Sequence, residues 1–456
     1  MKKKFNLAVA LVLLFASLLS ACSGGTGGST PPAESSSAPS AGAGSNEGEQ
    51  QAGGEASAYE IPEGTTITLV NGGGTSVEKQ MEMYGNALKK KFPQVNFDIR
   101  ASTKELNIDK MILNGDKFDI FVRSIGSIFY EMPKHNIQYD MTELMKRHNV
   151  DLGGIDPVLV DSMTTNAGGQ MWGIPFLNST LVLYYNKDMF DAFGVEYPKD
   201  GMTWDEVYET AKQFNQTKDG VQYIGLEYSN HHIVKLNNLG LSYVNPDTNL
   251  STYDDERWKT VLDVFYKPTQ DPGYQTFMAQ NENKMASGQF YEGRAAMVVT
   301  LVHHAGSEDF EKFDFDWDMV AAPTFTENPG VGGQAYPEYA AIPAFSENKD
   351  AAMEVIKYLI SDGFQLEFSK NGNMPVSLNK DVQAAYGTAK YEGKNQTAVF
   401  YNQFAPVMRK SPYDNDVEKK LTQYINDLAL GNMNVNTLLQ KAKEEADKVI
   451  AEKSGQ

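Results

Sequence analysis

Apolar residues follow two spacings along most of the chain. Short apolar runs bounded by turn residues are typical of buried strands, and they occur at residues 66–70, 95–99, 118–122, 180–185, 295–302 and 339–345. Apolar residues recur every three or four positions, as on one face of a helix, over residues 77–91, 187–193, 203–214, 254–266, 350–361, 417–430 and 435–452. Because strands alternate with helices, the pattern predicts an α/β fold whose sheets are parallel or mixed and covered by helices.

The N-terminal residues have the pattern of a secretory signal peptide. Three lysines within residues 1–4 precede an apolar run over residues 5–19, which is shorter than the ~20 residues that a transmembrane helix needs. The run ends in Leu19-Ser20-Ala21-Cys22, which resembles a bacterial lipobox. We expect residues 1–21 to be a lipoprotein signal peptide. Cys22 would then carry the acyl chains, such as palmitate, that anchor the protein at the extracellular face of a bacterial membrane. An ordinary signal peptide with a chance cysteine is the alternative.

The segment after the cysteine differs in composition from the rest of the chain. Residues 23–58 contain only Gly, Ser, Thr, Pro, Ala, Glu, Gln and Asn, so they offer no apolar side chain large enough to build a core. Together with Cys22 they predict a flexible linker over residues 22–58. The globular region is expected to begin near Tyr59.

Composition and charge exclude several classes of protein. The chain has 456 residues, of which 41% are apolar, enough for a large core. It carries 40 basic and 59 acidic residues, a formal net charge of −19, which argues against a nucleic-acid-binding protein. A single cysteine excludes an intrachain disulfide and a cysteine-based metal site.

No motif predicts a metal ion or a cofactor. The glycine-rich loop at residues 71–76 lacks the Lys-Ser/Thr ending of a phosphate-binding loop. The adjacent histidines at 231–232 and 303–304 lack the spacing of a zinc site. The oxygen-rich segment 245–249 lacks the central glycine and the final glutamate of a calcium-binding loop.

Several stretches resemble one family in the same order along the chain. They are GQMWGIP at 169–175, YYNKDMF at 184–190 followed by TWDE at 203–206, GRAAM at 293–297, the strand and helix over 339–359, and NGNMPV at 371–376. This order resembles the family 1 extracellular solute-binding proteins, the lipoprotein receptors of carbohydrate ABC importers, which are related to maltose-binding protein.

The resemblance implies a type II periplasmic-binding-protein-like fold of two α/β lobes. A hinge of crossing strands would join the lobes, with the ligand in the cleft between them. The family pattern places the crossings near residues 175–183, 297–300 and 339–343. The first lobe would comprise residues 59–176 plus 301–338, and the second lobe residues 177–300 plus 339–456.

The resemblance also implies a function without chemistry. The protein would capture a sugar or oligosaccharide outside the cell, as a monomer, and deliver it to the permease subunits of an ABC importer. A sensor or adhesion module of the same fold, or a receptor for a non-sugar solute, is the alternative. A glycosidase would need two carboxylates facing each other across a cleft, and no motif nominates such a pair.

Candidate ligand contacts are polar and aromatic residues that follow predicted strands. Sugars need carboxylates or amides for their hydroxyl groups and aromatic faces for their C–H patches, and ligands of α/β proteins bind at the carboxyl ends of parallel strands. The candidates chosen on this basis are Thr75, Ser76, Arg123, Trp172, Tyr228, His231, His303, Gln334 and Tyr336.

Most of these candidates also have a structural interpretation. Thr75 and Ser76 could simply belong to a tight turn, and Arg123 could form a salt bridge instead of binding hydroxyl groups. Trp172 could stack on a sugar or belong to the core. His303 shares its position after a strand with His304, and one of the two would contact the ligand.

Overall fold

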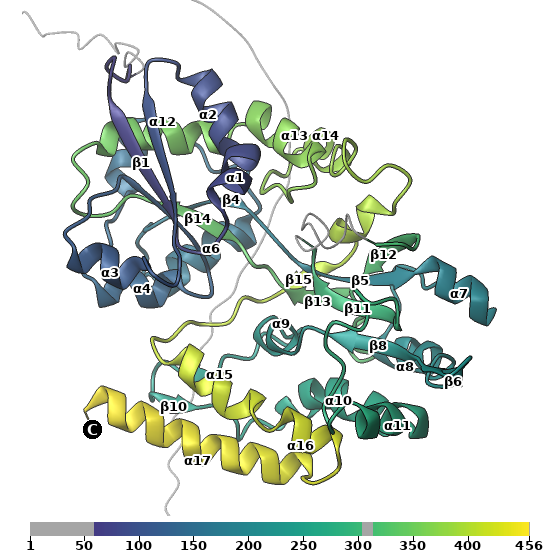
Figure 1. Ribbon diagram of the computed structural model, residues 1–456. Coiled ribbons are helices and arrows are strands. Elements are labelled where there is room, and N and C mark those ends of the chain that lie inside the picture. Colours follow the sequence, from purple (N-terminus) through teal and green to yellow (C-terminus); the bar gives the residue numbers. More distant parts are fainter. Residues whose placement is uncertain (1–58, 303–312, 456) are drawn as a thin grey trace, which may run out of the picture. The chain divides into compact units, whose positions relative to one another are not determined.

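The computed structural model describes residues 59–302 and 313–455, and their strands form two main sheets (Figure 1). The first sheet has the order β2-β1-β3-β14-β4, built from β1 (Thr66–Asn71), β2 (Asn96–Ala101), β3 (Ile120–Ser124), β4 (Ile174–Leu177) and β14 (Glu338–Ala341). The second sheet has the order β12-β5-β11-β8, built from β5 (Leu181–Asn186), β8 (Ile224–Tyr228), β11 (Ala295–Leu301) and β12 (Trp317–Ala321).

Three two-stranded ladders complete the strands. They are β6 (Thr217–Lys218) with β7 (Val221–Gln222), β9 (Val244–Asn245) with β10 (Leu250–Ser251), and β13 (Val331–Gln334) with β15 (Gln403–Ala405).

Both main sheets are mixed, as the alternating pattern predicts. In the first sheet β1 is parallel to β2 and β3, whereas β14 runs antiparallel to β3 and β4. In the second sheet β8 is parallel to β11, and β5 is antiparallel to β11 and β12. The carboxyl ends of the parallel strands therefore share an edge with the start of β14 in one sheet and the start of β5 in the other.

Helices surround each sheet. Those of the first sheet are α1 (Val77–Gln80), the π-helical η1 (Met81–Gly85), α2 (Asn86–Lys91), α3 (Ile108–Leu113), α4 (Ile128–Lys134), α5 (Thr142–Arg147), α6 (Pro157–Asn166), α12 (Lys349–Leu359), α13 (Asp362–Lys370) and α14 (Lys380–Ala384). Those of the second sheet are α7 (Lys187–Phe193), α8 (Trp204–Lys212), α9 (Asn230–Lys235), α10 (Trp258–Thr269), α11 (Pro272–Gln280), the 3-10 helix η4 (Gln396–Phe400), α15 (Asp414–Thr422), α16 (Ile425–Ala429) and α17 (Val435–Ser454).

Local sequence signals fix several helix ends. Thr203 accepts a hydrogen bond from the backbone N–H of Glu206, and the Glu206 carboxylate accepts one from Thr203, which forms the predicted capping box of α8. Asn186 caps α7, and Gly194 ends it with φ of 70°, a conformation that favours glycine. The helix predicted over residues 77–91 contains a π-helical turn that ends at Gly85, where a Cβ atom would lie 2.7 Å from Ile99 Cδ1 of β2.

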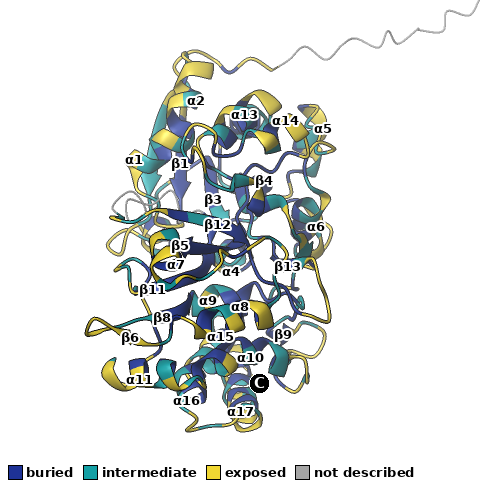
Figure 2. Cartoon of the chain, turned by 90° about the vertical axis from the view of Figure 1, so that its right-hand side faces the viewer, coloured by how far each residue is buried: buried dark blue, intermediate teal, exposed yellow. Residues whose placement is uncertain are grey.

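Each sheet has its own buried core. The core of the first lobe is formed by residues between Ile61 and Leu177 and between Ala335 and Val376. The core of the second lobe is formed by residues between Leu181 and Phe325 and between Met374 and Ile450. Figure 2 shows the strands in the colour of buried residues and exposed positions along the outer helices. Both lobes belong to one compact unit of residues 57–456.

These cores correct the expected lobe boundaries. Residues 317–325 were assigned to the first lobe, but β12 pairs with β5 and completes the second sheet. Residues 339–368 were assigned to the second lobe, but β14, green in Figure 1, lies among the purple and blue strands of the first sheet, and α12 and α13 pack in its core. An apolar run shows that a strand is buried but not which sheet it joins.

The segments that cross between the lobes also differ from the positions expected from the sequence. Residues 178–180 form the first crossing, inside the expected range. No crossing lies at residues 297–300, because β11 continues through the second sheet between β5 and β8. The chain returns to the first lobe at residues 335–337, just before the range expected for the third crossing, and passes back within residues 371–386.

Candidate ligand-binding site

The first lobe gathers polar residues at one edge of its sheet. Asn71 ends β1 and pairs with Val122 of β3, and Glu338 starts β14 and pairs with Ser124. This register brings the loop after β1, the end of β3 and the start of β14 together. We call these residues, Asn71–Gly73, Arg123, Ser124 and Glu338, the first-lobe edge.

The glycine loop lies flat against this edge. The backbone N–H of Gly72 donates to the Val122 carbonyl oxygen at 3.0 Å, and that of Gly73 donates to Asn71 Oδ1 at 2.7 Å. A Cβ atom on Gly72 would lie 3.0 Å from Arg123 Cδ. The glycines therefore allow the backbone to pass directly over the arginine side chain.

Arg123 forms the salt bridge that was the structural interpretation of this residue. Its Nε and Nη2 donate to the two oxygens of Glu131 on α4 at 2.7 and 2.6 Å, and both side chains are largely buried. This bidentate geometry fixes the plane of the guanidinium. Nη1 takes no part in the pair, and no hydrogen bond from it is recorded within the described part of the chain.

Glu338 is the one carboxylate of the first-lobe edge that lacks a partner among the described residues. It is half-buried, and its Oε1 would lie 4.0 Å from a Cβ atom on Gly73. Burial raises the pKa of the Glu338 carboxyl to about 7, although the positive charge of Arg123 opposes the shift. A desolvated carboxyl group without a partner is expensive for the fold, and such groups concentrate at functional sites.

The last residue of α9, Lys235, is a buried lysine of the second lobe. Lys235 Nζ donates to His231 Nε2 at 2.9 Å, and His231 Nδ1 contacts the Glu418 carboxylate, which also lies 3.5 Å from Lys235 Nζ. With Nε2 accepting, Nδ1 carries the proton that points to Glu418. The predicted ligand contact His231 thus holds the side chain of Lys235 in place.

Tyr336 joins the two lobes. It lies in the crossing, where its backbone N–H donates to the Ser179 carbonyl oxygen at 3.1 Å and to Asn178 Oδ1 at 3.2 Å. Its hydroxyl accepts from Ser124 Oγ at 3.2 Å. A Cβ atom on Gly126 would lie 2.9 Å from the Tyr336 hydroxyl and 3.6 Å from Lys235 Nζ. The loop after β3, the crossing and α9 therefore meet at one place.

Two further charged groups, Lys410 and Asp414, interact electrostatically with Lys235. Burial raises the pKa of the Asp414 carboxyl to about 6 and lowers the pKa of the Lys410 ammonium to about 8, while each charge favours the ionised form of the other. The backbone N–H of Lys410 donates to Asn166 Oδ1 of α6 at 2.6 Å. This hydrogen bond is a second direct tie between the lobes.

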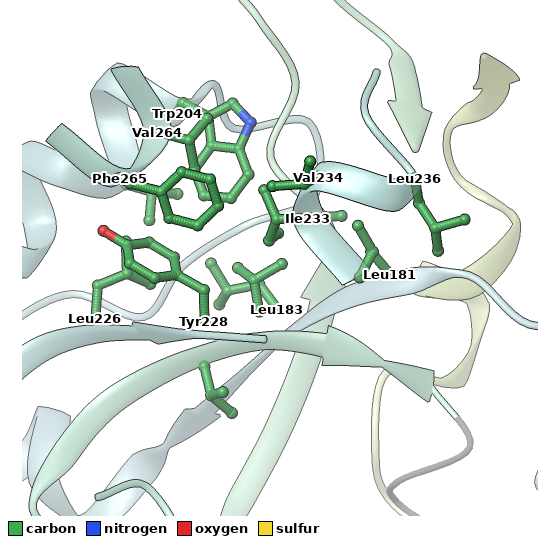
Figure 3. Close-up of a cluster of buried hydrophobic side chains, with 14 of the residues drawn as sticks. Leu181, Leu183, Trp204, Leu226, Tyr228, Ile233, Val234, Leu236, Val264 and Phe265 are labelled. Carbon is green, nitrogen blue, oxygen red and sulfur yellow. The ribbon is translucent and has the colours of Figure 1, made fainter. Parts of the chain in front are cut away.

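Two predicted site residues belong to the core instead. Tyr228 is 5% exposed, and its ring lies edge-on to Phe265 of α10 at 5.6 Å and near Trp204 (Figure 3). Gln334 is 1% exposed, donates to the Asn237 carbonyl oxygen and accepts from the backbone N–H of Met408. Tyr228 ends β8 and Gln334 ends β13. The side chain of Tyr228 packs against α10, and that of Gln334 bonds to the loop at Met408, so neither lies at the first-lobe edge.

The structure gives contacts within the first lobe for three of the remaining candidates. Trp172 is half-buried, its Nε1 donates to Gln170 Oε1, and its ring packs 6.0 Å from Phe129, so it joins the margin of the first core. Ser76 accepts from the backbone N–H of Lys79 and caps α1, and the Thr75 carbonyl oxygen accepts from Gln80. His303 and Cys22 lie outside the described residues.

Two charged residues of this region, Glu338 and Lys235, were not among the predicted candidates. Glu338 is a carboxylate directly before a predicted strand, so its type and position were visible, but the strand was placed in the wrong lobe. Lys235 lies four residues after His231, a spacing that brings two side chains together only on a helix. Residues 228–231 were expected to form a loop, whereas α9 begins at Asn230.

A separate hollow of about 90 Å³ lies on the second lobe. It is lined by Trp204, Tyr208, Asp263, Lys267 and residues 325–327, among others. None of its lining residues belongs to the first-lobe edge or to the group around Lys235.

Within residues 59–302 and 313–455, no cluster of three or more His, Cys, Asp or Glu side chains could hold a metal ion. Over the same ranges, no helix has the length and apolar character to cross a membrane.

Comparison with known sequences identifies the class of protein. Residues 72–366 match the sequence profile of the family described as bacterial extracellular solute-binding protein. This match covers more than half of the chain, so the chain belongs to that family.

Individual relatives are distant in sequence. A putative binding protein of Brucella abortus (strain 2308) is 22% identical over 294 residues, which are 62% of this chain and 68% of the relative. The sn-glycerol-3-phosphate-binding periplasmic protein UgpB of Rhizobium meliloti (strain 1021) is 23% identical over 323 residues, 62% of this chain and 69% of the relative.

Solved structures confirm the fold. An ABC substrate-binding protein of Listeria monocytogenes, in complex with cycloalternan, superimposes with a TM-score of 0.66 at 20% identity, over 85% of this chain and 100% of that protein. The fold is thus the two-lobed periplasmic-binding-protein type that the sequence motifs implied.

The charge on Glu338 should make the stability of the ligand-free protein depend on pH. The native carboxyl binds its proton more tightly than the unfolded one, whose pKa is near 4.5, so this group stabilises the fold below that value. Its contribution is lost as the pH rises through about 7. We expect Glu338→Gln to raise the unfolding temperature at pH 8 by roughly 2–4 °C and to change it little at pH 5, as measured by calorimetry. A lower unfolding temperature at pH 8 would contradict the assignment of Glu338 as a desolvated, unpaired carboxylate.

Proposed function

We propose that this protein captures a sugar or oligosaccharide between its two lobes and delivers it to the permease subunits of an ABC importer. The observation that carries the proposal is the convergence of polar strand ends from both lobes at the crossing. Ser124 bonds to Tyr336, and Gly126 lies beside Lys235. Ligands of α/β proteins bind at such strand ends, and a ligand held there contacts both lobes.

The charges at this place favour a neutral ligand. Arg123, Lys235 and Lys410 are cations, but Glu131 neutralises the first and Glu418 pairs with the second. Asp414 faces Lys410, and Glu338 adds a further carboxylate. An anion such as sn-glycerol 3-phosphate, which the name of one relative specifies, would meet no unpaired cation at the first-lobe edge. Hydroxyl groups, in contrast, both donate to carboxylates and accept from N–H groups.

A binding function without catalysis fits the same residues. Hydrolysis of a glycoside needs two carboxylates, one of them free to act as an acid and the other as a base or nucleophile. Arg123 holds Glu131 in a bidentate pair, so Glu338 has no second free carboxylate beside it among the described residues of the first-lobe edge. This arrangement supports a receptor rather than a glycosidase.

Of the predictions that follow from this proposal, the first concerns the class of ligand. Purified protein is heated with maltose, lactose, tagatose, ribitol or sn-glycerol 3-phosphate, and its unfolding temperature is measured. A ligand at 100 times its dissociation constant stabilises the native state by ~2.7 kcal/mol, because it binds the folded protein alone. We expect a rise with at least one neutral carbohydrate and none with sn-glycerol 3-phosphate. A rise with the phosphate alone would contradict the proposed ligand class.

The second prediction concerns the anchor. We propose that acyl chains on Cys22 hold the protein at the extracellular face of the membrane, and that residues 23–58 tether the two lobes to it. In a bacterial host given labelled palmitate, the wild-type protein should be labelled and sediment with membranes, because two or more acyl chains give lasting attachment. Cys22→Ala should lose the label and leave the membrane fraction, with Ser23→Ala as the matched control. Retention of Cys22→Ala on membranes would refute the lipid anchor.

A further inference from the structure

The strongest unassigned feature is the space in front of Gly73 at the first-lobe edge. A Cβ atom on Gly73 would lie 3.0 Å from Asn71 Oδ1 on one side, and 3.9 Å from Arg123 Nη1 and 4.0 Å from Glu338 Oε1 on the others. Because Gly73 has no side chain, a small polar group of a ligand placed there could reach both a donor, Arg123 Nη1, and an acceptor, Glu338 Oε1.

Both groups are available for a ligand. Arg123 uses Nε and Nη2 to bind Glu131, which leaves the two hydrogens of Nη1. Glu338 has no hydrogen bond or ion pair recorded within the described part of the chain. The bidentate pair with Glu131 fixes the guanidinium, and the pairing of Glu338 with Ser124 in the sheet fixes the backbone that carries the carboxylate.

We propose that Arg123 Nη1 and Glu338 form a clamp for two neighbouring hydroxyl groups of a carbohydrate, entering over Gly73. One hydroxyl donates to the Glu338 carboxylate, and its neighbour accepts from Arg123 Nη1. This inference rests on the proposed function and adds to it a first-lobe subsite and the chemical group that it recognises, a vicinal diol.

The chemistry of the pair explains this choice of ligand. A carboxylate beside a guanidinium cannot hold an anion closely, because the carboxylate repels it. A lone ammonium group would be repelled by Arg123. Two adjacent hydroxyl groups satisfy a donor and an acceptor at once, and hydrogen bonds to charged groups are the stronger ones.

Two variants and a control test the clamp. Gly73→Ala places a methyl group in the space without straining the backbone, because Gly73 does not adopt a positive φ. The methyl carbon would lie 3.0 Å from Asn71 Oδ1, so the Asn71 side chain has to move slightly away from it. Glu338→Gln keeps the shape of the side chain but removes its negative charge. Gly154→Ala is the control, since a Cβ atom there would meet nothing within 4 Å. Affinity is measured by calorimetry for the carbohydrate that stabilises the wild-type protein most, chosen from maltose, lactose, tagatose and ribitol.

We expect both Gly73→Ala and Glu338→Gln to bind that carbohydrate at least ~10-fold more weakly, and Gly154→Ala to bind it within about twofold of the wild type. Glu338→Gln should also raise the unfolding temperature of the ligand-free protein at pH 8. A residue with a purely structural role would not weaken binding and strengthen the fold together.

The possible failures are distinguishable. If the wild-type protein binds a carbohydrate and either variant binds it as tightly as the wild type does, the clamp is wrong and the proposed function stands. If the wild-type protein binds none of the four carbohydrates, the proposed function fails and the clamp fails with it.

Discussion

The antiparallel pairing of β14 with β3 is the constraint on which the rest of the structure depends. It returns the chain to the first sheet after residues 181–334 have built most of the second lobe. It also places Glu338 opposite Ser124, so that a carboxylate from late in the sequence joins the loops that follow β1 and β3. The lobe boundaries, the crossing at Tyr336 and the composition of the first-lobe edge all follow from this pairing.

Electrostatics at the site follow a consistent pattern. Buried charges are costly unless they are paired, and most of the charges near the crossing have a partner. Arg123 binds Glu131, and Lys235 is held by His231 and Glu418. Among the described residues, the carboxylate of Glu338 forms no hydrogen bond or ion pair, and burial raises its pKa. The Glu338 carboxylate lowers the stability of the ligand-free protein and lies at the first-lobe edge. Such a loss of stability is expected where a residue is kept for binding rather than for the fold.

Much of the fold could be predicted from local patterns. The apolar runs marked the central strands, the Thr203 and Glu206 pair marked the start of α8, and Gly194 marked the end of α7. These signals are local because a cap or a turn involves residues close together in the chain. The motif order along the sequence implied the two-lobed fold, which the structural comparison confirms.

The site was predicted less well, for reasons of geometry. Tyr228 and Gln334 have the residue types of ligand contacts, but the direction of a side chain at a strand end depends on the packing of α8, α10 and the loop at Met408. His231 contacts Lys235 because α9 is a helix, and its expected contact with the ligand stays a prediction. Arg123 forms the salt bridge that was its structural interpretation, and its role in binding hydroxyl groups stays a prediction. Assignments that depend on tertiary contacts cannot be read from spacing alone.

The most direct test of this account is a crystal structure of the protein with a bound carbohydrate. The account predicts electron density for the ligand between the two lobes, with a pair of ring hydroxyl groups beside Gly73, Arg123 and Glu338. Density confined to another part of the molecule, such as the hollow of about 90 Å³ beside Trp204 and Tyr208, with the first-lobe edge empty, would contradict it.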